Sequence, residues 1–211
     1  MTKFFAFAAA ALVVGLVGGT TYAVFFNKPD DPLAQCRGGA VASGQAAIGG
    51  AFELVSETGE TVTDKDVFTK PSLVYFGYTF CPDVCPMDTY RNAEAVDVLK
   101  ELGYDVQPVF ISIDPERDTP EVVAEFTDAL HPEMLGLTGT PEQVAAASRA
   151  YKTYFRKQDG DPEYYLVDHS TFTYLVLPEV GFVDFFRREV TPDEMAERVK
   201  CFLDADIKSG V

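Results

Sequence analysis

The sequence predicts an α/β domain with a mixed β-sheet, preceded by one N-terminal transmembrane helix. Three observations predict this arrangement: an uncharged apolar run near the N-terminus, an alternation of strand-like and helix-like segments after it, and three Thr-Pro pairs that mark helix starts. The 211 residues are enough for one domain of about 150–180 residues and an appendage. We therefore expect a membrane anchor over 1–27, a flexible tether over 28–49 and a folded domain over 50–206.

The anchor prediction depends on the segment from Phe4 to Phe26, which is 23 residues long and uncharged. This length spans a bilayer as a helix, whereas a secretory signal has a shorter apolar core of about 7–15 residues. Thr21 also fits poorly three residues before a cleavage after Ala23. We expect an uncleaved, single-pass anchor in a bacterial inner membrane, with the domain in the periplasm. Lys3 and Lys28 flank the span, so the charge bias that orients it is weak.

The composition limits the classes of partner. The chain has 33 acidic and 17 basic residues, which gives a formal net charge of −16 at pH 7. Because no basic stripe is available to neutralise phosphates, we exclude a nucleic-acid partner. The acidic surface is typical of a soluble domain and is compatible with a cationic partner or a metal ion.

The domain alternates strands and helices. We expect strands at 71–78, 106–114, 134–139, 171–177 and 181–188, a hairpin over 51–63, and helices at 83–103, 119–131, 140–155 and 191–206. This order indicates a layered α/β domain with a mixed sheet. A thiol pair that follows a strand and opens a helix, in a chain that ends strand–strand–helix, is the thioredoxin-like plan.

Two cysteines follow the first long strand, in the stretch "YFGYTFCPDVCPMD" at 75–88. Cys81 ends a turn and Cys85 falls in the first turn of the next helix, where backbone N–H groups and the helix dipole lower the pKa of a thiol. The spacing of four places both side chains on one helical face. Because a thiolate is both a nucleophile and a metal ligand, redox exchange, metal binding and a structural disulfide all remain open at this point.

A third candidate ligand lies far along the chain. The two histidines are His131, which we interpret as a charge at a helix exit, and His169, which precedes a strand. In a thioredoxin-like sheet, the loop before the final hairpin passes beside the cysteine turn, and redox enzymes of that fold place a cis-proline there. This chain has no proline between Pro162 and Pro178 and has His169 instead. Two thiolates and one imidazole suit Cu(I), Cu(II) or Zn(II), and we expect Asp168 to orient the ring.

Three segments resemble a known family. "FGYTFCPDVCP", "ISIDPERDTPEVVAEF" and "YLVDHSTFTYLVLP" follow one another in this order, and together they resemble the Sco/SenC family of copper-binding assembly proteins. The resemblance extends from about Gly50 to about Leu203, which is nearly the whole domain. It implies a membrane-anchored, thioredoxin-like domain that binds one copper ion and helps to build the CuA centre of cytochrome c oxidase.

Carried onto this chain, the resemblance implies that Cys81, Cys85 and His169 bind Cu(I) or Cu(II). The implied partners are the CuA-bearing subunit of cytochrome c oxidase and another periplasmic copper donor. The alternative is an enzyme, a thiol–disulfide reductase that uses Cys81 and Cys85 as a redox pair on the oxidase cysteines, or a periplasmic redox sensor. A peroxidase would leave the Cys-x-x-x-Cys spacing and His169 without a role.

A loop beside the site is a further implication of the resemblance. Asp114, Pro115, Arg117 and Asp118 match the family's segment near the metal. The same residues are equally compatible with a turn and capping network ahead of the helix that Thr119 begins.

A second cysteine pair lies outside the ligand pattern. Cys36 belongs to the tether, which is rich in Gly, Ala, Pro and Ser, and Cys201 belongs to the last helix. In an oxidising compartment the two would form a structural disulfide that pins the tether to the domain. Two free thiols or an intermolecular bond are the alternatives.

Overall fold

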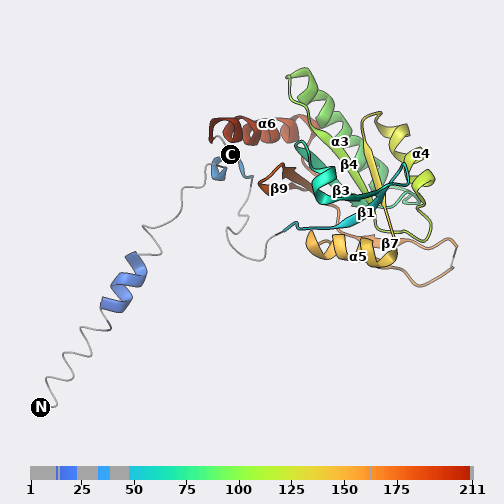
Figure 1. Ribbon diagram of the computed structural model, residues 1–211, viewed down its shortest axis with the longest axis horizontal. Helices are drawn as coiled ribbons and strands as arrows, with labels where there is room; N and C mark the ends of the chain where they lie inside the picture. The colour runs from blue at the N-terminus through green and yellow to red at the C-terminus, as the bar shows by residue number, and fades with distance from the viewer. Residues whose placement is uncertain (1–12, 14, 23–32, 39–47, 162, 210–211) are drawn as a thin grey trace, which may run out of the picture. The chain divides into compact units, whose positions relative to one another are not determined.

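A computed structural model of the chain describes residues 13, 15–22, 33–38, 48–161 and 163–209 (Figure 1). The chain divides into two compact units, Met1–Ala34 and Gln35–Val211. In the first unit residues 15–22 are helical. Among the helices of the described residues, none combines the length and the apolar character that a membrane span needs. Most of the predicted anchor lies outside the described residues, so the anchor stays a prediction.

The second unit is built on a mixed seven-stranded sheet with the strand order β2-β1-β5-β4-β3-β8-β9. The pairs β3–β4 and β4–β5 are parallel, and the other pairs are antiparallel, which confirms the predicted mixed sheet. The strands are β1 (Glu53–Ser56), β2 (Thr61–Thr63), β3 (Ser72–Gly77), β4 (Gln107–Ser112), β5 (Leu135–Thr138), β8 (Thr173–Leu177) and β9 (Gly181–Phe186).

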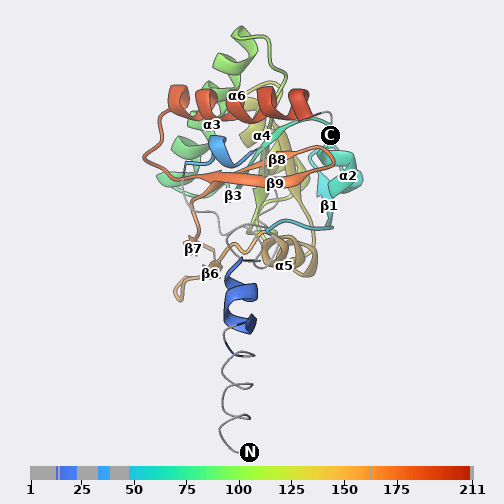
Figure 2. The same ribbon diagram turned by 90° about the vertical axis from the view of Figure 1, so that its left-hand side faces the viewer.

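Helices cover both faces of this sheet. Figures 1 and 2 show α3 and α6 on one face and α5 on the other. The helices are α2 (Asp64–Val67), α3 (Val84–Glu101), α4 (Pro120–Leu130), α5 (Pro141–Ala150) and α6 (Pro192–Ser209). The three Thr-Pro pairs begin α4, α5 and α6, and each threonine hydroxyl accepts a backbone N–H of the first turn, as a capping residue does.

The interior strand β3 positions the site. All six of its residues are buried, because helices cover the sheet on both sides and β4 and β8 flank the strand. Its carboxyl end leads into the turn that carries Cys81, and α3 begins three residues later. The predicted order of strand, cysteine turn and helix is therefore confirmed.

A two-stranded ribbon is the main feature that the sequence did not predict. The expected helix over 140–155 ends early, at Ala150, and the chain leaves it through Lys152, whose φ is 55°. The following residues form β6 (Phe155–Lys157), which pairs antiparallel with β7 (Val167–His169) in a separate small sheet. The helix prediction for residues 151–155 was wrong, because Phe155 pairs with β7 and the four residues before it lead into β6. This ribbon carries the candidate histidine ligand.

Candidate metal centre

The two cysteines of the turn face one another at the start of α3. The Cys81 amide donates a hydrogen bond to the carbonyl oxygen of Tyr78 (3.3 Å), which closes the turn after β3. The Cys85 amide, in the first turn of α3, donates to the Sγ atom of Cys81 (3.4 Å). Both side chains are buried and both are free thiols. The Cys81 sulfur therefore takes the place of a capping oxygen at the helix N-terminus.

His169 completes a cluster of three donor atoms. Its Nε2 atom lies 3.3 Å from the Sγ atom of Cys85, and one ligand atom from each of Cys81, Cys85 and His169 lies within 4.8 Å of the other two. The Nδ1 atom lies 2.9 Å from the carbonyl oxygen of Ser170. Because a carbonyl oxygen only accepts, Nδ1 carries the proton and Nε2 directs its lone pair at the sulfurs. The sequence-predicted ligands are thus brought together from three separate segments.

The two thiols differ in acidity. The hydrogen bond from the Cys85 thiol, together with the N–H groups of Asp83 and Cys85, lowers the pKa of Cys81 to about 4. Donation of that hydrogen bond to Cys81, and then burial, raise the pKa of Cys85. The site therefore holds one thiolate and one thiol, which is the state from which a metal displaces a single proton.

Two tyrosines and a glycine shape the walls of the cluster. The rings of Tyr75 and Tyr78 meet the His169 ring edge-on, with centroids 6.2 and 5.8 Å away. Burial raises the pKa of Tyr78 to about 12, so the phenol stays neutral beside the thiols. A Cβ on Gly77 would lie 2.8 Å from the Tyr75 ring and 3.1 Å from the Cys85 sulfur. Only glycine leaves space for both, and the sequence pattern did not single out these three residues.

The predicted supporting role of Asp168 needs a correction. Its carboxylate bonds to Arg156 (3.2 Å) and to Gln158 (2.6 Å) across the β6–β7 ribbon. Neighbouring residues of a strand point to opposite faces, so Asp168 turns away as His169 turns inward. The carbonyl oxygen of Ser170 is the group that orients the imidazole.

The loop between β4 and α4 is tied to the cysteine turn. The buried carboxylate of Asp118 accepts hydrogen bonds from the Thr79 hydroxyl (2.6 Å), the Thr79 amide (3.1 Å) and the Ser112 hydroxyl (2.6 Å). Arg117 bonds to Asp114 (2.6 Å) and to the carbonyl oxygen of Tyr165 (3.0 Å). This loop is therefore a turn network ahead of α4 and also a support of the site, because Asp118 holds Thr79, two positions before Cys81.

Exposed apolar side chains occur close along the chain to the two cysteines, and one more contacts Phe80. Phe80, next to Cys81, is 45% exposed, and Met87, two residues after Cys85, is 60% exposed. Tyr164 is 65% exposed, and its ring meets that of Phe80 with centroids 6.2 Å apart. We call Phe80, Met87 and Tyr164 the apolar rim. Exposed apolar groups gathered at a site are typical of a surface that binds another protein.

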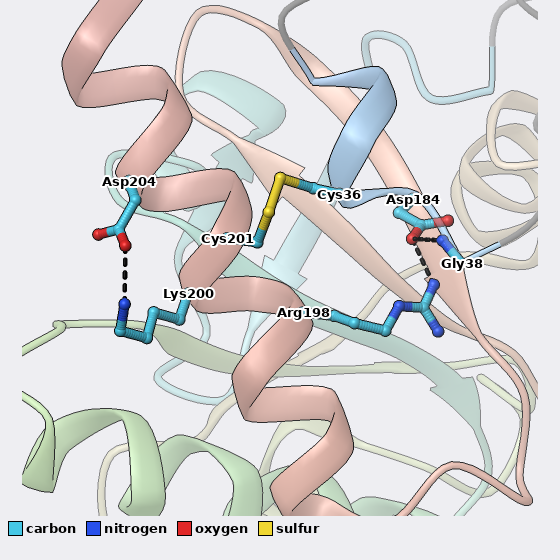
Figure 3. The surroundings of a disulfide bond; sticks show 7 residues. All are labelled: Cys36, Gly38, Asp184, Arg198, Lys200, Cys201 and Asp204. Carbon is cyan, nitrogen blue, oxygen red and sulfur yellow. Dashed lines mark hydrogen bonds and ion pairs between the residues drawn. A yellow bond between two sulfur atoms is a disulfide. The ribbon is translucent and has the colours of Figure 1, made fainter.

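The remaining histidine and cysteines lie outside the cluster. His131 accepts a hydrogen bond from the Glu133 amide and pairs with Asp97 of α3 through Nε2 (3.3 Å), which is a structural role at a helix end. Cys36 and Cys201 are joined in a disulfide with a Cα–Cα distance of 5.6 Å (Figure 3). The structure thus contains the pair that the sequence suggested.

Two buried sulfurs and the nitrogen of one half-buried imidazole form a donor set for a soft or borderline metal ion. Such sets bind copper or zinc, whereas magnesium and calcium prefer oxygen donors. Three protein ligands leave room for one more, which is the arrangement of a site that exchanges its ion or a ligand. The geometry therefore fits a transferable Cu or Zn ion.

Comparisons with known proteins point to one family. A family model described as SCO1/SenC matches residues 40–204. Protein SenC of Rhodobacter capsulatus is 57% identical over 205 residues, which cover 97% of this chain and 92% of that protein. Protein SCO1 homolog 1, mitochondrial, of Arabidopsis thaliana is 44% identical over 74% of this chain and 47% of that protein.

Solved structures agree with this result. Arabidopsis thaliana ScoI with copper bound matches with a TM-score of 0.72 and 43% identity, over 75% of this chain and 99% of that one. Bradyrhizobium japonicum ScoI with copper bound matches with a TM-score of 0.67 and 38% identity, over 73% of this chain and 98% of that one.

Proposed function

The chain belongs to the SCO1/SenC family, and from this premise we propose that it is a membrane-anchored copper chaperone. It binds one copper ion through Cys81, Cys85 and His169 and delivers it to the CuA-bearing subunit of cytochrome c oxidase. The observation that carries this proposal is the convergence of two sulfurs and one imidazole nitrogen within 4.8 Å. Similar proteins of known structure hold copper, which supports copper over zinc.

The donor set suits an ion that is bound and then released. Thiolates bind Cu(I) well, and the imidazole nitrogen extends the binding to Cu(II). Because the pKa of Cys81 is lowered and that of Cys85 is raised, the proton released when copper binds should come mainly from Cys85. In transfer, an incoming ligand from the acceptor would take the remaining position before the three protein ligands release the ion.

The surroundings of the site suit a protein acceptor. The apolar rim of Phe80, Met87 and Tyr164 offers exposed contact area: Phe80 and Met87 lie within two residues of a ligand along the chain, and Tyr164 contacts Phe80. Another protein that covers this rim would exclude water during transfer and bring its own ligands close. A periplasmic copper donor would use the same approach to load the site.

The proposal includes the N-terminal anchor and its location. A single membrane span over 1–27 would hold the domain on the periplasmic face of a bacterial inner membrane. Attachment to the membrane of the oxidase raises the effective concentration of the domain near its acceptor. The uncharged run from Phe4 to Phe26 supports this part of the proposal.

A second candidate function is thiol–disulfide exchange by the same two sulfurs. Cys81 has the lowered pKa of a nucleophile, and the Cys85 sulfur lies within 4.8 Å of the Cys81 sulfur. The pair could pass two electrons to an oxidised acceptor disulfide and close as the Cys81–Cys85 disulfide. The chain would then be an oxidoreductase that prepares the oxidase cysteines for copper.

Copper transfer separates the two candidates. Full-length protein in detergent is loaded with one equivalent of copper and mixed with the reduced, copper-free CuA domain of the oxidase. The chaperone predicts that the purple CuA absorption appears, and that His169→Ala suppresses it while leaving disulfide exchange intact. If the His169→Ala protein matures the CuA domain as fast as the parent when free copper is supplied, the oxidoreductase is the better description.

A further inference from the structure

Residues 36–38 of the tether are held on the domain by more than the disulfide. The Arg37 Nε atom donates a hydrogen bond to the carbonyl oxygen of Val183 (3.2 Å). The Gly38 amide donates to the Asp184 carboxylate (3.4 Å), as Figure 3 shows. Val183 and Asp184 belong to β9, which is an edge strand of the sheet. The segment therefore follows the sheet edge instead of leaving the domain at once.

Asp184 is the centre of this attachment. It is 1% exposed and forms an ion pair with Arg198 of α6 (Figure 3). The Arg198 guanidinium also lies over the Phe186 ring, 4.6 Å from its centroid. A Cβ on Gly38 would collide with that guanidinium. Glycine is thus what allows the chain to pass so close to the ion pair. The disulfide and the hydrogen bonds from Arg37 and Gly38 to β9 together make residues 36–38 part of the fold.

One partner of the disulfide borders a cleft: Cys201 is half-buried, whereas Cys36 is buried. A cleft of about 380 Å³ reaches Cys201 and is lined by Gln35, Glu197, Lys200, Cys201, Asp204 and Ala205. Its rim is polar, with an ion pair between Lys200 and Asp204 at 2.7 Å (Figure 3). A thiol of another molecule can approach a disulfide that lies in an open cleft, since exchange requires access to a sulfur.

We propose that the Cys36–Cys201 disulfide is a latch that sets the length of the membrane tether, and that a dithiol opens it. The proposal rests on the anchor of the proposed function. With the latch closed, the seven residues 28–34 lie between the predicted anchor and the second unit and would span at most about 25 Å if extended. With it open, the free length grows toward the 22 residues 28–49 and about 75 Å.

Opening is a thiol–disulfide exchange in two steps. A thiolate of the dithiol attacks one sulfur, breaks the Cys36–Cys201 bond and forms a mixed disulfide. The second thiol of the dithiol then displaces the protein sulfur. Cys36 and Cys201 gain two electrons and two protons and end as thiols, while the dithiol ends as its own disulfide. Cys81 and Cys85 take no part.

The first test uses the full chain in liposomes, with a protease site placed within 39–47. A closed latch predicts that the cut domain floats with the liposomes and is released when dithiothreitol is added. In Cys201→Ser, cleavage alone should release it. Release of the parent domain by cleavage alone, or its retention after reduction, overturns the proposal. If the uncut chain never floats with the liposomes, the anchor is refuted, and so is the claim that the disulfide sets the length of a membrane tether. A non-reducing gel then still reports whether the disulfide joins the two cut fragments.

The second test measures reach. About twenty Gly and Ser residues are inserted within 39–47, and the height of the domain above the bilayer is followed by energy transfer from a domain dye to a lipid dye. The latch predicts no change in height for the parent and an increase in Cys201→Ser. The same insertion within 28–32 should raise the domain in both. A greater height for the parent with the 39–47 insertion contradicts the latch.

Discussion

Cys81 and Cys85 lie four residues apart and are free thiols, whereas Cys36 and Cys201 lie 165 residues apart and are bonded. The first pair faces an imidazole at a helix N-terminus, and the second lies between a tether segment and the last helix, beside an ion pair. Spacing alone would favour a bond between the near pair. The groups around a thiol, and not its distance along the chain from another cysteine, therefore decide whether it binds metal, reacts or forms a disulfide.

Removal of single sulfurs should distinguish the two cysteine pairs most clearly. Cys81→Ser and Cys85→Ser should each lower copper affinity by more than the roughly 10–100-fold that is typical of losing a supporting hydrogen bond. Cys36→Ser, the matched control, removes a sulfur that lies outside the donor cluster and should leave the affinity unchanged. Native mass spectrometry against a copper-binding competitor gives both values. Equal losses from both pairs would show that copper binding depends on the fold and not on the cluster.

The pH dependence of alkylation sharpens the difference between the two thiols of the site. Because the pKa of Cys81 is lowered to about 4, its thiolate persists as pH falls, and its alkylation rate should stay level from pH 8 to pH 5. An ordinary thiol loses about tenfold per pH unit below its pKa of about 8.5. In Cys85→Ala the donated hydrogen bond is gone, so the profile should shift to higher pH. Peptide mapping after iodoacetamide labelling checks this, and an unshifted profile would contradict the assigned cause.

Loss of the Cys36–Cys201 disulfide should change the stability of the fold more than the copper affinity. Cys36→Ser or Cys201→Ser should lower the free energy of unfolding by about 2–5 kcal/mol, because the bond closes a long loop in the unfolded chain. Urea unfolding of the oxidised proteins measures the change. Reduction of the parent should reproduce it, and an unchanged urea midpoint in the variants would show that the polar contacts of residues 36–38 suffice.

The smallest expected effect concerns the loop that holds the cysteine turn. Thr79→Val removes a hydroxyl from the buried Asp118 carboxylate and should cost about 1–3 kcal/mol of stability together with a several-fold loss of copper affinity. Thr119→Ala, from the same loop, removes the α4 cap instead and should cost about 1 kcal/mol with no loss of affinity. Thermal unfolding and copper competition on both variants check the contrast. Equal copper affinities for the Thr79→Val and Thr119→Ala variants would show that the loop does not support the site.

The sequence predicted the fold where local patterns were strong. Buried β-branched runs marked β3 and β4, and the Thr-Pro pairs fixed three helix starts. The β6–β7 ribbon escaped prediction because strands of three residues have almost no periodicity, and their pairing depends on contacts across a loop. The ligands could be proposed from residue type and motif. The Ser170 carbonyl and the space that Gly77 leaves could not, because both depend on backbone position. Asp168 was expected to orient the ring, but its carboxylate bonds to Arg156 and Gln158.

The central claim is that His169 is the third copper ligand, and an anaerobic copper titration of the reduced full-length protein beside His169→Ala tests it most directly. If His169 is a ligand, the parent protein should bind one equivalent of copper tightly and show a thiolate-to-Cu(II) absorption band after addition of Cu(II). The His169→Ala variant should lose the band and the tight binding, while its urea midpoint stays near that of the parent. An unchanged copper affinity and band in a folded His169→Ala protein would contradict the three-ligand site.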